Sequence, residues 1–188
     1  MDKRFKRDSE QKIQSIYKAF TELVNEEGYD NLTARQIAGR AGISVGTIYH
    51  YFKEGKPAIA AALYEKNLVE TLDIENLTGS SLIGIRQQVK RHLQLHQQNK
   101  ELYRAFDQAI YSHSDIFKGA KRKREEILAE QLGDPDPERI QGIMRVYSTV
   151  DAVIHRHLFV EPLFGSDTEL VDYLTVIAES SLGFNGSP

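Results

Sequence analysis

Two pairs of residues in the second half of the chain could do chemistry, because their spacing places each pair on one face of a helix. His92 and His96 are four residues apart, so their imidazoles could bind one metal ion. Asp151 and His155 have the same spacing, and the carboxylate could orient the imidazole inside a pocket. No carboxylate or cysteine stands at a supporting position near His92 and His96 in the sequence. We therefore interpret their polar segment as a solvated face or a pocket wall, and assign neither a metal nor a cofactor.

The sequence does not favour an enzyme. It has no glycine-rich phosphate loop, no nucleophile elbow and no His-Glu-x-x-His pattern. The absence of cysteine also excludes disulfides, thiolate metal sites and a cysteine nucleophile. Two alternatives to a DNA-binding function stay open: a small helical hydrolase or lyase that uses one of the pairs above, and a helical protein-interaction module.

The segment at residues 42–52, GISVGTIYHYF, carries a different kind of chemistry. Three polar-tipped rings follow one another, at Tyr49, His50 and Tyr51. On a helical wheel Val45, Ile48 and Phe52 share the side that can pack on the preceding helix, while Gly46, Thr47 and His50 point the other way. Tyrosine hydroxyls can donate to phosphate oxygens, and a threonine can meet a base edge. The pattern is typical of a helix that enters a DNA groove.

The elements that would position this segment are helices. Apolar residues from Ile13 to Val24 recur at helical spacing, and Gly28 is expected to end that helix. Thr33 and Gln36 form a capping box for a short second helix, Gly42 ends it, and Ser44 can cap the third. A fourth helix begins near Pro57, and "DIENLTGSS" is expected to be a linker. Further helices are predicted at about 80–98, 100–113, 118–132, 137–162 and 167–182. The fold class is all-α with about nine helices.

Residues 32–52, LTARQIAGRAGISVGTIYHYF, closely resemble the DNA-binding segment of the tetracycline-repressor-like (TetR) family of regulators. The matching features are Thr33, the Ile-Ala pair at 37–38, AGIS at 41–44, Gly46 and the aromatic residues that lead to Phe52. The resemblance implies a three-helix DNA-binding domain at 1–55 and a helical effector-binding and dimerisation domain at 56–188. It implies a ligand-responsive repressor that binds pseudo-palindromic operator DNA as a homodimer.

The resemblance also implies roles for individual residues. DNA contacts are expected from the start of the second helix, from the third helix and from a lysine near the fourth: Thr33, Arg35, Ser44, Val45, Gly46, Thr47, Tyr49, His50, Tyr51, and Lys53 or Lys56. The segment FKEGK is one residue longer than the usual family form, which leaves the choice between the two lysines open. The dimer interface is expected on the last two long helices.

The effector pocket is predicted from polar and aromatic residues of the second domain. The candidates are Tyr103, Phe106, Asp107, Tyr111, Tyr147, Asp151 and His155. For each of them, an aromatic core with satisfied polar groups is the alternative.

The charge distribution agrees with a DNA-binding N-terminal domain. The chain of 188 residues carries a net charge of −3, yet residues 1–56 hold ten basic and eight acidic residues. The balance is therefore +2 in this region and −5 in the rest, a sign that suits DNA binding at the N-terminal end. The cluster Lys3, Arg4, Lys6 and Arg7 could form an arm near phosphate, or a disordered basic start. With no apolar run long enough for a bilayer and no secretory signal, we expect a cytoplasmic protein.

Overall fold

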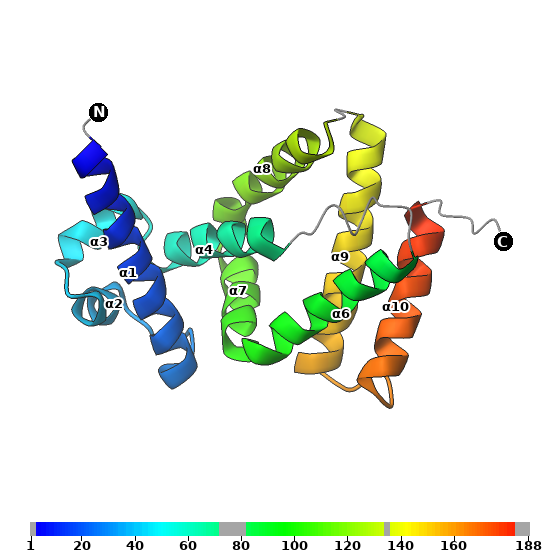
Figure 1. The fold of residues 1–188 in the computed structure, drawn as a ribbon. Helices are drawn as coiled ribbons and strands as arrows, with labels where there is room; N and C mark the ends of the chain where they lie inside the picture. Colours follow the sequence, from blue (N-terminus) through cyan, green and yellow to red (C-terminus); the bar gives the residue numbers. More distant parts are fainter. Residues whose placement is uncertain (1–2, 72–81, 134–135, 183–188) are drawn as a thin grey trace. The chain divides into compact units, whose positions relative to one another are not determined.

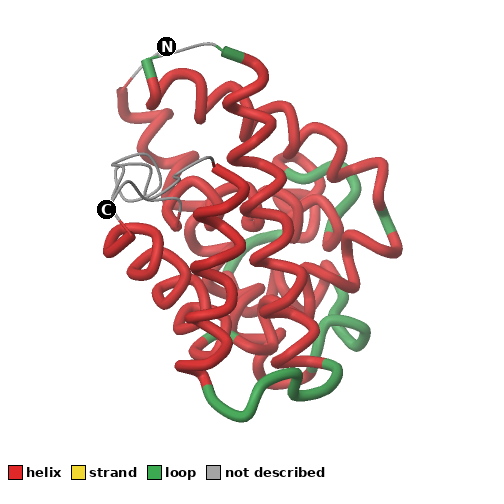
Figure 2. The backbone as a smooth tube through the Cα atoms, turned by 90° about the vertical axis from the view of Figure 1, so that its right-hand side faces the viewer, coloured by secondary structure: helices red, strands yellow, loops and turns green. Residues whose placement is uncertain are grey.

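The computed structural model describes residues 3–71, 82–133 and 136–182, and every regular element in those ranges is a helix (Figures 1 and 2). The prediction of an all-α fold with about nine helices is confirmed. The elements are α1 (Lys3–Glu27), α2 (Ala34–Ala41), α3 (Val45–Tyr51), α4 (Lys56–Thr71), α6 (Leu82–Gln98), α7 (Lys100–Ser112), α8 (Ser114–Leu132), α9 (Pro137–Phe159) and α10 (Asp167–Leu182). The predicted linker DIENLTGSS lies outside the described residues.

Two helix starts differ from the sequence prediction. α8 begins at Ser114, four residues before the predicted position, so that His113 alone separates it from α7. α1 begins at Lys3, which places the basic residues of the N-terminus in the first turns of a helix. The chain forms two compact units, one of residues 1–67 with 100–120 and the other of residues 68–99 with 121–188.

The first unit is built on α1, whose apolar face packs on α2 and α7. Ile16, Phe20 and Ile37 are fully buried there. The Phe20 ring meets Tyr29 edge to face at 6.3 Å between centroids. Gly28 follows α1 with a φ of +76°, a left-handed conformation that glycine adopts without a steric cost, and this turns the chain toward α2.

The second unit has a core made by α6, α9 and α10, which lie side by side in Figure 1. Its buried side chains are aliphatic: Ile85, Val89, Leu93, Val146, Val150, Ile154, Leu170, Val171, Leu174 and Ala178. Helices of this kind interlock through branched side chains and need no sheet to cover their apolar faces. No helix in the described part of the chain is both long and apolar enough to cross a membrane.

Candidate nucleic-acid interface

The start of α2 is fixed by the capping box that the sequence predicts. The Thr33 hydroxyl accepts a hydrogen bond from the Gln36 amide at 3.2 Å, and the Thr33 amide donates to Gln36 Oε1 at 2.9 Å. Gln36 Nε2 also donates to Glu27 at 2.7 Å, which ties the cap to the end of α1. These bonds satisfy amide groups that the first turn of a helix leaves without intrahelical partners.

The turn between α2 and α3 depends on one glycine and one serine. Gly42 has a φ of +69°, and its amide reaches back to the carbonyls of Ala38 and Gly39. Ser44 then caps α3, since its Oγ accepts from the Thr47 amide at 3.0 Å and lies 2.9 Å from the Thr47 hydroxyl. The two helices and this turn form a helix-turn-helix.

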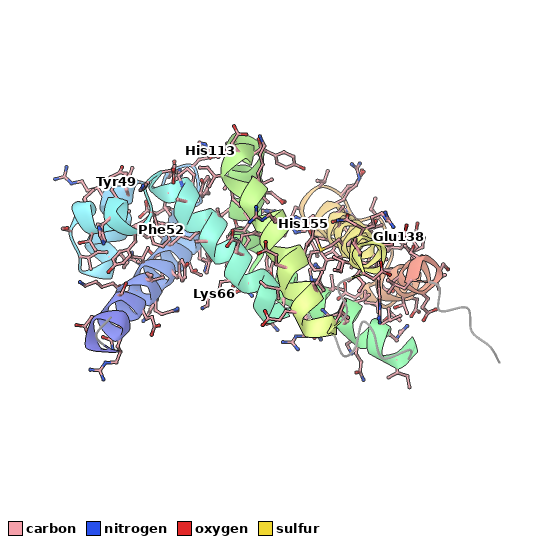
Figure 3. All side chains as sticks on the ribbon, turned by 90° about the horizontal axis from the view of Figure 1, so that it is seen from above. Tyr49, Phe52, Lys66, His113, Glu138 and His155 are labelled. Atoms are coloured by element: carbon pink, nitrogen blue, oxygen red, sulfur yellow. The ribbon has the colours of Figure 1, made fainter. Side chains whose placement is uncertain are left out.

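The inner side of α3 packs into the first unit. Ile48 is fully buried and Phe52 is nearly so. Phe52 lies next to α1, with its ring centroid 5.9 Å from that of Tyr17 (Figure 3). The expectation that Val45 shares this packed side is wrong, because Val45 is 38% exposed. Side chains in a helix lean toward its N-terminus. The side chain of Val45, the first residue of α3, therefore projects over the turn instead of onto α2.

The outer side of α3 is open to solvent. Tyr49 is 50% exposed, and His50 packs its ring against Tyr51 at 5.0 Å. Of the residues that the sequence assigns to DNA, the exposed ones are Thr33, Arg35, Ser44, Val45, Gly46, Tyr49, His50 and Lys53. Thr47, Tyr51 and Lys56 are half-buried. α3 and its N-cap residue Ser44 therefore offer a polar and aromatic surface along their exposed side.

The two candidate lysines differ in their surroundings. Lys56 Nζ donates to the Tyr29 carbonyl at 2.8 Å and lies 4.1 Å from the centre of the Tyr29 ring. Burial lowers the pKa of Lys56, and the nearby Asp30 carboxylate opposes that shift. Burial and Asp30 also raise the pKa of Tyr29 to about 12. Lys53 is exposed.

The sequence reading missed the residue that joins α2 to α1. Arg40 forms a two-pronged ion pair with Glu26, at 2.9 and 2.6 Å, and reaches Glu22 at 3.4 Å. The hydrogen bond from Arg40 lowers the pKa of Glu26. The partners are 14 and 18 residues apart, so local periodicity carries no signal for the pairing.

A second contact holds the loop after α3 against the helix. Gly55 has a φ of +65°, and a Cβ at this position would lie 3.2 Å from Cε1 of Tyr49. The Tyr49 ring therefore rests on the backbone of this loop, which fixes its direction before any ligand binds. The contact gives a structural reason for glycine in FKEGK.

The structure divides the predicted effector residues between the two units. Tyr103, Phe106, Asp107 and Tyr111 are on α7 of the first unit, where Phe106 is buried against Tyr64 and Tyr111 is 87% exposed. Tyr147, Asp151 and His155 are on α9 of the second unit. Tyr147 lines a small apolar cavity in that unit, together with Ile85, Gln88, Val89, His92, Val146, Val150 and Ala178.

Comparison with known proteins agrees with this architecture. Residues 16–63 match the family described as "Bacterial regulatory proteins, tetR family". A search of curated proteins found no sequence match. Among solved structures, a TetR transcriptional regulator from Rhodococcus sp. RHA1 superposes with a TM-score of 0.73 at 19% identity, over 96% of this chain and 99% of that one.

Two further structures show the same fold. A TetR-family regulator from Streptomyces coelicolor has a TM-score of 0.63 at 22% identity, with 92% of this chain and 98% of the other covered. One from Marinobacter aquaeolei VT8 has a TM-score of 0.61 at 18% identity, with 95% and 97% covered. Residues 16–63 of this chain thus match the TetR family of bacterial regulatory proteins, and the chain as a whole has the fold of solved TetR-family transcriptional regulators.

Proposed function

We propose that the protein is a ligand-responsive repressor that binds a pseudo-palindromic operator as a homodimer. The observation that carries the proposal is the surface of α3. This helix buries Ile48 on one side and exposes Ser44, Gly46, Tyr49 and His50 on the other. A recognition helix needs this division, because its N-terminal residues contact base edges while its inner side anchors it to the domain. A cytoplasmic location, as expected from the sequence, is part of the same proposal.

The residues on this surface suit different parts of the DNA. Gly46 leaves the backbone of α3 open to a close approach, since a Cβ there would meet only Ser44 Oγ, at 3.6 Å. Tyr49, oriented by Gly55, can donate to a phosphate oxygen. Val45 and Thr47 offer methyl groups for contact with thymine, and the Thr47 hydroxyl offers a hydrogen bond.

Release by an effector follows from a population shift. A small molecule bound in the second unit would favour a conformation whose two recognition helices no longer match successive major grooves. The cavity lined by Tyr147 has a volume of about 20 Å³, which is room for about one water molecule, so an effector would bind there only after the surrounding helices move apart. A ligand that leaves operator affinity unchanged is not an effector.

Selection from a random double-stranded DNA pool tests the proposal. We expect one enriched sequence with two-fold symmetry and half-sites about one helical turn apart. Enrichment of a site without symmetry would contradict the dimer. No enrichment, from protein whose helical content and cooperative unfolding are intact, would contradict sequence-specific DNA binding.

The surroundings of the two lysines predict different effects for matched substitutions. Lys53→Gln should weaken operator binding several-fold and leave stability unchanged, because the side chain is exposed. Lys56→Gln should instead lower the free energy of unfolding by about 1 kcal/mol, because the bond to the Tyr29 carbonyl is lost. Fluorescence anisotropy on the selected operator and urea denaturation separate the two. The assignment fails if Lys56→Gln alone weakens binding while stability is unchanged.

The dimer interface is proposed on α9 and α10, as the family resemblance implies. α10 buries Leu170, Leu174 and Ala178 in its own core yet leaves Tyr173 48% and Val176 59% exposed. A helix with apolar residues on both sides can pack on its own unit and on a second copy of the chain.

Val176→Asp tests this interface. We expect a monomer at micromolar concentration. Two-fold symmetry would bury the new carboxylate of each copy in the same apolar interface, where the charge loses its hydration and gains no partner. Light scattering during size exclusion measures the mass. The control is Ile83→Asp, a substitution at a residue of α6 that is 68% exposed, which should leave the mass unchanged. A Val176→Asp protein that remains dimeric would place the interface elsewhere.

A further inference from the structure

Four side chains of the types that bind metals lie close together in the second unit. They are the two i, i+4 pairs of the sequence, which the fold brings next to each other. His92 and His96 project from α6, and Asp151 and His155 project from α9 (His155 is labelled in Figure 3). His92 Nε2 lies 2.9 Å from Asp151 Oδ1, and His96 Nε2 lies 2.8 Å from His155 Nε2. Asp151 Oδ1 is also 3.4 Å from His96 Nε2 and 3.6 Å from His155 Nε2.

The cluster lies inside the unit. The side chains of His92 and His96 are 4% and 0% exposed, and those of His155 and Asp151 are 15% and 26% exposed. Although burial raises the pKa of Asp151, the hydrogen bond from His92 opposes that shift, and the pKa is lowered overall. Burial lowers the pKa of His96. The group is therefore a largely buried set of three imidazoles and one carboxylate, which are side chains that bind transition metals.

One hydrogen bond orients a ligand nitrogen. His96 Nδ1 lies 2.8 Å from the backbone carbonyl of His92, and a carbonyl can only accept, so Nδ1 carries the proton. The Nε2 lone pair of the neutral ring then faces the cluster, where Asp151 Oδ1 presents lone pairs of its own. A second-shell bond from the far nitrogen to a carbonyl is the usual way in which proteins orient a histidine ligand. His92 Nδ1 is buried without a hydrogen-bond partner among the described residues, so the only polar partner of this ring there is Asp151, at Nε2.

The distances fit a four-coordinate ion. In a tetrahedral zinc site the bonds to nitrogen and oxygen are about 2.0–2.1 Å, so neighbouring ligand atoms are about 3.3 Å apart. Four of the six separations among these ligand atoms, from 2.8 to 3.6 Å, bracket that value. The ligand atoms of His92, His96 and Asp151 all lie within 4.8 Å of one another, and His155 would complete the set by moving toward His92. Three imidazoles with one carboxylate suit Zn²⁺ and related transition metals, whereas Mg²⁺ and Ca²⁺ prefer oxygen ligands.

We propose that His92, His96, Asp151 and His155 form a binding site for a divalent transition-metal ion of the zinc class, which joins α6 to α9. The site is independent of the DNA-binding proposal, because metal binding is measured without DNA. Residues of the cluster border the cavity described above, since His92 belongs to both.

The test uses the full chain, prepared without a histidine tag and stripped of metal by a chelator. Titration with Zn²⁺ against a chromophoric chelator should give one ion per chain, and Zn²⁺ should raise the melting temperature. Co²⁺ should produce the intense visible absorption of a four-coordinate ion. Asp151→Asn and His155→Gln, at the two more exposed ligands, should each weaken Zn²⁺ binding by more than about 100-fold, since even loss of an outer-shell partner commonly costs 10–100-fold.

His157→Gln is the matched control. It lies on the same helix two residues beyond His155, and its Nδ1 accepts a hydrogen bond from the Leu163 amide at 3.0 Å, outside the cluster. This variant should bind Zn²⁺ as the native chain does. The proposal is overturned if the native chain binds no Zn²⁺, or if binding survives in folded Asp151→Asn and His155→Gln proteins. The first result would identify the cluster as a hydrogen-bonded polar group, and the second would indicate surface binding.

Discussion

Gly46→Ala should weaken operator binding by about 1–3 kcal/mol, roughly five- to 150-fold, while the free protein becomes no less stable. The added methyl group has room in the free protein, because its nearest neighbour outside the adjoining residues would be Ser44 Oγ at 3.6 Å. Alanine also favours a helix over glycine by up to about 1 kcal/mol. Loss of binding would therefore come from the approach of α3 to DNA, and not from damage to the fold.

Gly39→Ala provides the comparison. Gly39 lies within α2, and a Cβ there would meet nothing within 4 Å. Both variants should unfold at the same or a higher urea concentration than the native chain, but only Gly46→Ala should lose affinity in a fluorescence anisotropy titration. Equal affinities for the two variants would show that the backbone of α3 does not come close to DNA at this position.

Phe20→Ala should lower the free energy of unfolding by about 3–5 kcal/mol, the usual range for a fully buried phenylalanine. Phe20 is 0% exposed and packs edge to face on Tyr29. Domains are typically stable by only about 5–15 kcal/mol, so the variant should also lose DNA binding near physiological temperature. Urea denaturation followed by circular dichroism measures the change.

Tyr111→Ala is the control for this effect. Tyr111 belongs to the same unit but is 87% exposed, so its removal should change the free energy of unfolding by less than about 0.5 kcal/mol. A small effect of Phe20→Ala would mean that α1 can repack around the space, and would show that Phe20 contributes little to holding this core together.

Local signals in the sequence were sufficient to predict the helix-turn-helix. The capping box at Thr33 and Gln36, the left-handed Gly28 and Gly42, and the cap at Ser44 each involve residues within a few positions of one another. Their geometry depends on backbone rules that act at that range. The exposure of Val45 differs from the prediction. Val45 is the first residue of α3, and at the end of a helix the periodicity no longer predicts which side a residue faces.

The histidine and aspartate cluster could not be predicted in the same way. Both i, i+4 pairs are visible in the sequence, but His92 is 59 residues from Asp151, and His96 is 59 residues from His155. The carboxylate of Asp151 therefore comes close to His92 and His96 only when α6 packs against α9.

The internal contacts of Arg40 and Lys56 have a consequence for the dependence of DNA binding on ionic strength. Residues 33–56 contain four cationic side chains, at Arg35, Arg40, Lys53 and Lys56. Arg40 forms ion pairs with Glu26 and Glu22, and Lys56 donates a hydrogen bond to the Tyr29 carbonyl. Two cationic side chains of each motif, Arg35 and Lys53, then remain for contact with phosphate. A dimer would then displace about four condensed counterions through its motifs, which corresponds to a slope of about −4 for the logarithm of affinity against the logarithm of salt concentration. Affinity would depend largely on uncharged donors such as Tyr49 and Thr47, and the complex would tolerate concentrated salt better than one held by many lysines.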